Sequence, residues 1–132
     1  MLPGKTSALR SPLTHNRFQN ALGIEFVELH DDGATMRLGV EETHLNVAGV
    51  VHGGVTFSLA DSAIGYGIFN IVRKRCTTAE MKINYLRPVF GGEMLARSTI
   101  LKAGRSLVVA RAEVRCDGAL VAEALATFAV LE

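Results

Sequence analysis

The sequence predicts an α+β fold in which a strongly curved antiparallel sheet wraps round one long central helix. Two observations support this prediction. Residues 53–72 are almost entirely apolar with a single charge among them, and four strand-like segments of 11–13 residues follow. A helix that is apolar on nearly every side has to be enclosed by other elements, and a curved sheet is the most economical enclosure for one helix.

A short helix is predicted before the sheet, over residues 14–21. Thr14 is a suitable N-cap for this helix, and Gly23 is a suitable stop. We expect Phe18 and Leu22 to anchor it, because they are the large apolar side chains of this part of the chain.

Two strands are predicted next, over residues 24–30 and 34–41. The turn between them reads Asp31-Asp32-Gly33, and an Asp-Gly pair supplies the positive φ that a tight hairpin turn requires. The second strand alternates regularly, which predicts one buried and one exposed face. The residues expected on the buried face are Ala34, Met36, Leu38 and Val40.

Four further strands are predicted after the long helix, separated by turns that contain Gly, Pro or Asp-Gly. In the first of them, alternation places Met81 and Ile83 on one face and Thr78 and Lys82 on the other. Long alternating strands are typical of an antiparallel sheet with one face in water. The predicted ranges are 76–87, 93–103, 106–116 and 119–131.

Composition limits the class of protein. The chain has 132 residues, so we expect one domain, residues 23–132, preceded by an N-terminal arm, residues 1–22, that carries the short helix. The 14 basic and 13 acidic residues give a formal net charge of +1, which argues against binding to nucleic acid. Hydrophobic residues make up 48% of the chain, a content that favours a homo-oligomer with apolar surface in its interfaces.

The cysteines and the N-terminus indicate where the protein acts. Cys76 and Cys116 are far apart and fit no metal-binding spacing, so we expect free thiols in the cytoplasm. Prolines and a glycine interrupt the apolar core that a signal peptide would need. The apolar segment 53–72 is long enough to cross a membrane, but its charge and polar residues make it a poor lipid-facing helix, so we expect no membrane association.

Two adjacent glycines open the predicted long helix. The first-turn N–H groups of a helix have no intrahelical acceptors, and without a Cβ at Gly53 and Gly54 a ligand oxygen can approach them. The pair therefore indicates an oxyanion site, to which the side-chain amide of Asn46 can add a donor. The alternatives are that the glycines serve a tight turn or close packing, and that Asn46 is a turn residue.

One carboxylate lies in the middle of the same helix. Burial of an unpaired charge is costly, so Asp61 has either a partner or a use. It follows Gly53 by eight residues, which is ~12 Å along a helix, so the two residues can serve one reaction only if they come from two subunits related by a two-fold axis. The alternative is a structural carboxylate that accepts hydrogen bonds from Ser58, Ser62 or Thr56.

Other polar groups are less specific. His44 and His52 have no Asp, Glu, Cys or His at a spacing suited to a metal, so we expect structural roles for them and no metal site. Two basic clusters could bind a phosphorylated ligand, although such clusters are more often solvated turns or helix ends. The clusters are Arg73-Lys74-Arg75 and the turn that contains Lys102, Arg105 and Ser106.

A combination of motifs carries a family resemblance. It consists of the run His44-Leu-Asn46-Val-Ala-Gly49-Val-Val-His52-Gly53-Gly54, followed by Leu59-Ala60-Asp61. With these motifs the chain resembles hotdog-fold acyl-CoA thioesterases of the phenylacetate-pathway type, from about residue 20 to the end. Related strand-end and turn residues of that family match Asn84-Tyr-Leu-Arg-Pro88, Gly92-Glu93 and Lys102-Ala-Gly-Arg105.

The resemblance implies a hotdog fold, a dimer or a dimer of dimers, and hydrolysis of an acyl-CoA with an aromatic or medium-chain acyl group. The Gly53 N–H, assisted by Asn46, would polarise the thioester carbonyl, and Asp61 of the other subunit would act as nucleophile or general base. Thr77 and Thr78 both match a hydroxyl position of relatives, and Thr78 is favoured. Coenzyme A is part of the substrate, and no separate cofactor is implied. The residues expected to bind the substrate are His52, Gly54, Thr77, Arg87, Lys102, Arg105 and Ser106.

Two alternative functions remain open. A hotdog hydratase or dehydratase is disfavoured, because no His follows Asp61 within a few residues as it does in the hotdog hydratases. A non-catalytic acyl-CoA-binding module could retain Gly53 and a pocket, but it would have no need of Asp61 in an apolar helix.

Overall fold

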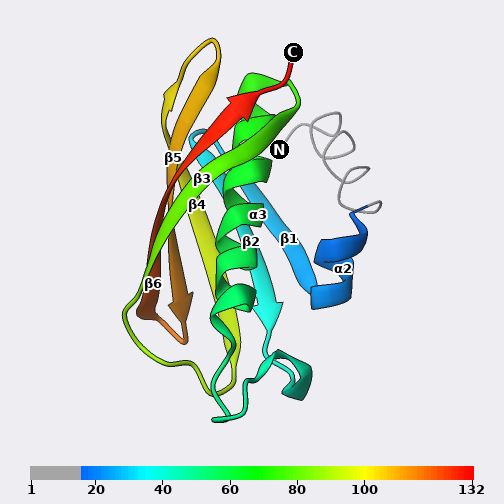
Figure 1. Ribbon diagram of the computed structural model, residues 1–132, viewed down its shortest axis with the longest axis vertical. Helices are drawn as coiled ribbons and strands as arrows, with labels where there is room; N and C mark the ends of the chain where they lie inside the picture. Colours follow the sequence, from blue (N-terminus) through cyan, green and yellow to red (C-terminus); the bar gives the residue numbers. More distant parts are fainter. Residues whose placement is uncertain (1–15) are drawn as a thin grey trace.

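A helix of 20 residues, α3 (Gly53–Val72), lies at the centre of the computed structural model, which describes residues 16–132. Its predicted bounds are confirmed. A curved sheet wraps round α3, and α2 (Arg17–Leu22) lies against α3 and the first strand (Figure 1). The other elements are β1 (Ile24–His30), β2 (Gly33–Gly39), the short 3-10 helix η1 (Glu42–His44), β3 (Cys76–Tyr85), β4 (Glu93–Ala103), β5 (Leu107–Cys116) and β6 (Ala119–Val130).

The sheet has six strands in the order β1-β2-β4-β5-β6-β3, and all neighbouring strands are antiparallel. Figure 1 shows one open layer folded round α3, so the predicted α+β architecture is confirmed. The strands differ from their predicted ranges only near their ends. The largest differences are at β2, which ends at Gly39, and at β3, which ends at Tyr85, each two residues before the predicted end.

Small side chains on the inner face of the sheet allow the helix to lie close to it. Leu59, Ile64 and Ile68 of α3 are fully buried and belong to one core with the sheet. Alanines leave enough room for a helix at native packing density, so the curved sheet can enclose α3 without steric conflict. These alanines are Ala96, Ala110, Ala112, Ala122, Ala124 and Ala126.

The buried position of α3 explains its composition. By length and mean hydropathy alone this helix could cross a membrane, but 61% of its most apolar window is buried inside the protein. The apolar surface that would face lipid in a membrane span therefore faces the sheet, and α3 is the core helix of this fold.

Two glycines bring α3 into contact with the backbone of β2 and β4. A Cβ atom on Gly67 would lie 2.7 Å from the Ser98 Oγ and 3.0 Å from the Gly33 Cα, and a Cβ on Gly33 would clash with the Ser98 carbonyl oxygen. The hairpin at residues 31–33 is confirmed, but its predicted positive φ is wrong, because the φ of Gly33 is not positive. Gly33 is required for close approach rather than for the turn.

The N-terminal helix differs from its prediction in where it begins and in which residue anchors it. It begins at Arg17, with the Asn16 side chain accepting a hydrogen bond of 3.2 Å from the Gln19 N–H, whereas the predicted cap Thr14 lies outside the described residues. The predicted stop is confirmed, because Gly23 ends α2 with φ 85°. Phe18 is 63% exposed and does not anchor the helix, and Gln19 is the residue that is buried.

Candidate active site

Among residues 16–132, Asp61 has one hydrogen-bond partner, and it comes from the sheet. The Thr78 Oγ1 on β3 donates a hydrogen bond of 2.6 Å to the Asp61 Oδ1. Three helix hydroxyls were the expected partners of Asp61 if it were a purely structural carboxylate. All three make their hydrogen bonds to other groups. Ser58 donates to the Gly54 carbonyl, Ser62 to the Ser58 carbonyl and Thr56 to the Met94 sulfur.

A β-bulge turns Thr78 toward α3. In the pairing of β3 with β6, Thr78 lies opposite Phe128 and Glu80 lies opposite Thr127, so Ala79 is an extra residue. An extra residue reverses the alternation of side chains on the two sides of a bulge. Thr78 and Met81 therefore share the inner face, and the prediction that Thr78 lies on the face opposite Met81 is wrong.

The environment of Asp61 acts on its pKa in two opposing ways. Partial burial raises the pKa of the Asp61 carboxyl above its ordinary value, and the hydrogen bond from Thr78 lowers it. Burial is the larger effect. A half-buried carboxylate with a raised pKa and one hydroxyl partner is suited to accept a proton or to attack a carbonyl carbon.

The N-terminus of α3 presents a backbone N–H. His52 caps the helix, because its Nδ1 accepts a hydrogen bond of 2.9 Å from the Gly54 N–H. The Tyr85 hydroxyl donates a hydrogen bond of 2.8 Å to the Gly53 carbonyl oxygen. Within residues 16–132 the Gly53 N–H has no acceptor, so it is available to a ligand oxygen at the positive end of the helix dipole.

Asn46 shapes the loop before α3. Its Oδ1 accepts hydrogen bonds of 2.9 Å from the Ala48 N–H and 3.2 Å from the Val50 N–H, which is the turn role that the sequence left open. Its amide nitrogen makes no hydrogen bond in the described part of the chain and stays available to a ligand. His44 is buried, and both of its ring nitrogens have partners. Its Nδ1 accepts a hydrogen bond from the Glu41 N–H, and its Nε2 lies 2.7 Å from the Leu22 carbonyl oxygen.

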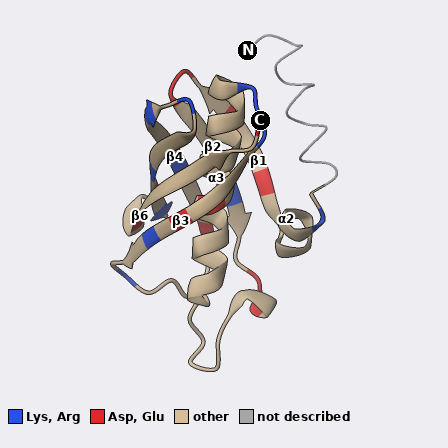
Figure 2. Ribbon diagram, turned by 45° about the horizontal axis from the view of Figure 1, so that its top comes forward, with Lys and Arg blue, Asp and Glu red and all other residues tan. Residues whose placement is uncertain are grey.

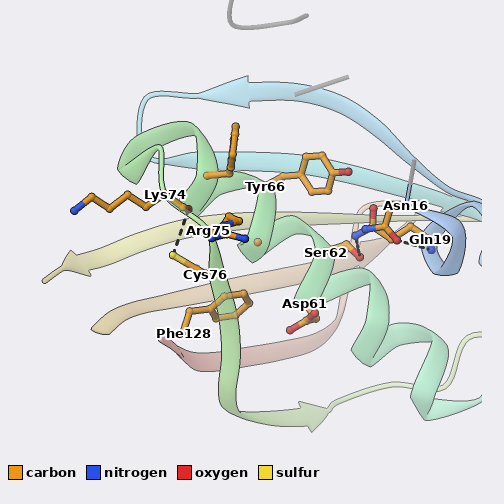
Figure 3. Close-up of a pocket in the computed structure, with 11 residues that line it drawn as sticks. Asn16, Gln19, Asp61, Ser62, Tyr66, Lys74, Arg75, Cys76 and Phe128 are labelled. Carbon is orange, nitrogen blue, oxygen red and sulfur yellow. Dashed lines mark hydrogen bonds between the residues drawn. The ribbon is translucent and has the colours of Figure 1, made fainter. Parts of the chain in front are cut away.

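Asp61 lines a cleft of about 340 Å³, called here the Asp61 cleft. Figure 3 shows Asp61 on α3 and Phe128 on β6 at this cleft. Gln19 of α2 lies toward one end, and Lys74 and Arg75 lie toward the other. The remaining lining residues are Asn16, Ser62, Gly65, Tyr66, Phe69 and Cys76.

Gly53 lines a second cleft of about 330 Å³, called here the Gly53 cleft. Arg87 and Tyr85 line it as well, so the structure brings Arg87 to the predicted oxyanion donor. The two clefts share none of their described lining residues. Asp61 and Gly53 of one protomer therefore lie in different clefts. This agrees with the prediction from their offset along the helix.

The basic turn with Lys102, Arg105 and Ser106 lies at the opposite end of the molecule from Gly53. The Ser106 carbonyl accepts a hydrogen bond from the Val130 N–H, which places the turn beside the C-terminal end of α3. Figure 2 shows Lys and Arg residues at this end. A helix of 20 residues is ~30 Å long, so the turn is remote from the Gly53 cleft of the same protomer.

Several residues of the Asp61 cleft gave no recognisable signal in the sequence. Gln19 and Tyr66 are both buried, and the Gln19 Oε1 and the Tyr66 hydroxyl have no hydrogen-bond partner in the part of the chain that the structure describes. Burial raises the pKa of Tyr66 to about 12, so its hydroxyl is neutral at physiological pH. Thr77 is exposed and makes no bond to Asp61. No group of three or more His, Cys, Asp or Glu residues suited to a metal ion occurs within residues 16–132.

Comparison with known proteins gives a family match. A family model described as the thioesterase superfamily matches residues 48–123, which include the glycine pair, Asp61 and Thr78. The chain is 31% identical to the medium/long-chain acyl-CoA thioesterase YigI of Salmonella typhimurium, over 88% of this chain and 86% of that protein.

Solved structures agree with the sequence match. A conserved protein of Pseudomonas aeruginosa, PA5202, is 37% identical with a TM-score of 0.85, over 88% of this chain and 94% of that one. A mutant of the phenylacetic acid degradation protein PaaI from Thermus thermophilus is 30% identical with a TM-score of 0.83, over 88% of this chain and 100% of that one. Both similarities extend over most of the described structure.

Proposed function

We propose, on the premise that this chain belongs to the thioesterase superfamily and has the hotdog fold, that it hydrolyses acyl-CoA thioesters to a free acid and CoA. The single observation that carries the proposal is the Asp61 carboxylate, held by Thr78 at the wall of an otherwise largely apolar cleft. The acyl-CoA thioesterase activity named for the YigI relative supports the choice of thioester.

The chemistry follows from two groups. The Gly53 N–H stabilises the negative charge that develops on the carbonyl oxygen, a contribution typically worth ~3 kcal/mol of barrier for one such donor. Asp61 acts on the carbonyl carbon, either directly or through water. In the direct route a carboxylate oxygen attacks the carbon, the C–S bond breaks to release the CoA thiolate, and water then hydrolyses the acyl intermediate on Asp61, which restores the carboxylate and leaves one proton for the thiolate. In the water route, Asp61 takes a proton from the water whose oxygen attacks the carbon, the C–S bond breaks, and the proton passes to the CoA sulfur.

The proposed site is shared by two subunits. β3 carries Thr78 and lies at the edge of the sheet, so one row of its backbone groups is unpaired within the described protomer. An exposed edge strand of 10 residues is a template for pairing with a second chain. A two-fold pairing of this kind sets two α3 helices side by side and antiparallel, with Asp61 of one subunit facing Gly53 of the other.

The substitution Asp61→Asn tests the role of the carboxylate. Asparagine keeps the size and an acceptor for the Thr78 hydroxyl but cannot take a proton or form the acyl intermediate. We expect roughly a 10²–10⁴-fold loss of free-thiol release from acyl-CoA. Asp31→Asn, a change in an exposed turn, is the control. Full activity of Asp61→Asn would overturn the assignment.

Mixed subunits test whether the site is shared. Gly53→Pro removes the N–H donor at the first helical position, where proline is best tolerated. Each variant alone should be inactive, but a heterodimer of Asp61→Asn and Gly53→Pro subunits contains one intact pairing of Asp61 with Gly53. Partial recovery of activity is expected. Folded heterodimers that stay inactive would contradict a shared site.

A further inference from the structure

Three small residues lie in the middle of α3, and the structure separates their roles. Ala63 is fully buried, and its carbonyl accepts a hydrogen bond of 2.6 Å from the Ser98 hydroxyl. Gly67 lies against the backbone of Gly33, where a side chain does not fit. Gly65 alone among the three lines the Asp61 cleft. Ala63 and Gly67 thus serve packing, whereas Gly65 borders open space.

Neither backbone conformation nor packing against the described residues requires glycine at residue 65. Its φ is not in the left-handed region, and the nearest described atom to a Cβ placed there is the Phe128 Cε2 at 3.7 Å, an ordinary van der Waals contact. Glycine inside a helix is less favourable than alanine. The effect of the missing side chain at Gly65 is therefore to widen the Asp61 cleft.

Gly65 lies close enough to Asp61 for the width of the cleft at Gly65 to affect the acyl group of the substrate. Asp61, Gly65 and Phe69 succeed one another at four-residue intervals, so they lie along one face of α3 and all line the cleft. Gly65 is one helical turn, ~6 Å, beyond Asp61. An acyl group whose carbonyl carbon is at Asp61 and whose chain lies in the cleft passes between Gly65 and Phe128.

A second observation marks the same cleft as a ligand site. Gln19 is 8% exposed, and its Nε2 donates a hydrogen bond of 2.8 Å to the Ser62 Oγ, whose own hydrogen goes to the Ser58 carbonyl. This orientation leaves the Gln19 Oε1 buried and without a partner among residues 16–132, on a side chain that lines the cleft. Buried polar atoms are nearly always paired, so this oxygen is suited to a ligand group or to a water bound with the ligand.

We propose that Gly65 is a specificity-determining residue, which admits acyl groups broader than a straight chain, such as ring-containing or branched ones, beside Asp61. The inference rests on the proposed function, because it needs Asp61 at the carbonyl carbon. The inference names the residue that selects the acyl group. It also gives the direction in which the acyl group lies, along α3 from Asp61 toward Gly65.

The test compares Gly65→Ala and Gly65→Val with the unmodified protein on phenylacetyl-CoA, isovaleryl-CoA and butyryl-CoA. Added methyl groups in a substrate pocket typically change kcat/KM by roughly 10–200-fold. We expect Gly65→Val to lower kcat/KM for the two broader substrates by about 10-fold or more relative to butyryl-CoA, with Gly65→Ala between. Gly39→Ala, whose Cβ meets no atom of residues 16–132 within 4 Å, is the matched control.

The outcomes separate this inference from the proposed function. A protein that hydrolyses none of the three substrates contradicts both. An active protein whose Gly65→Val variant loses activity equally on all three contradicts the specificity role alone. Light scattering on each variant is part of the test, because a changed oligomeric mass would assign Gly65 to subunit packing and would overturn the inference.

Discussion

The Thr78 hydroxyl donates to the Asp61 carboxylate across the space between β3 and α3, at 2.6 Å. This bond stabilises the ionised form of a carboxyl group that burial pushes toward the neutral form. Thr78 therefore acts through Asp61: it holds one carboxylate oxygen and keeps the pKa of Asp61 lower than burial alone would leave it.

Replacement of Thr78 by valine should move the pH profile of hydrolysis. Valine removes the bond that lowers the pKa of Asp61, so that pKa rises further. In the proposed mechanism the ionised carboxylate is the active form, so the acidic limb of kcat/KM against pH should shift to higher pH. Thr77→Val is the matched control, since Thr77 is exposed and makes no bond to Asp61. A lower rate with an unshifted limb would assign Thr78 to another role.

Asp61→Asn should raise thermal stability at neutral pH. The folded-state pKa of Asp61 lies above its ordinary value of 3.8. The protonated carboxyl therefore contributes fully to the free energy of unfolding below pH 3.8, and this contribution is lost as pH rises through the folded-state pKa. The neutral amide avoids the cost of a buried charge. Differential scanning calorimetry should therefore show a higher Tm for the variant near neutral pH, and the gap should narrow in acid. A lower Tm near neutral pH would contradict this account.

Replacement of Gly65 and of Gly67 by alanine should change the free energy of unfolding in opposite directions. A Cβ at Gly67 meets the Gly33 backbone and the Ser98 hydroxyl, and overpacking of this kind typically lowers the free energy of unfolding by about 1–3 kcal/mol. Gly65→Ala adds a Cβ at ordinary contact distance and should raise the free energy of unfolding by up to about 1 kcal/mol. Urea unfolding of both variants measures the difference. Equal effects would show that the close approach at Gly67 is not required.

Much of the fold could be predicted from the sequence because its patterns are local. An almost uncharged apolar run with glycines at its start and basic residues after its end predicts a helix from Gly53 to about Val72, which is the range of α3. Alternation and turn residues define the strands, because a half-buried antiparallel strand has a period of two. Ala34, Met36 and Leu38 of β2 are buried as this rule predicts, but Thr35 on the other face is buried too, so that face is not exposed along its whole length.

The rest depends on contacts between distant segments. Simple alternation places Thr78 on the wrong face, because the bulge at Ala79 is set by pairing with β6 and leaves no local mark in the sequence. Gly33 reads as a turn glycine, but its neighbour in space is Ser98 on β4. Gln19 carries no periodic signal, and only the packing of α2 on α3 brings it to Ser62.

The separation of the Asp61 cleft from the Gly53 cleft has a consequence for the protein in solution. In the proposed arrangement an isolated chain carries two half-sites and no complete one, so activity per chain depends on protein concentration. Dilution below the dissociation constant of the dimer should lower specific activity in proportion to the fraction of paired chains. A substrate that contacts both chains should counteract this loss, since it binds the associated state in preference to the separated one.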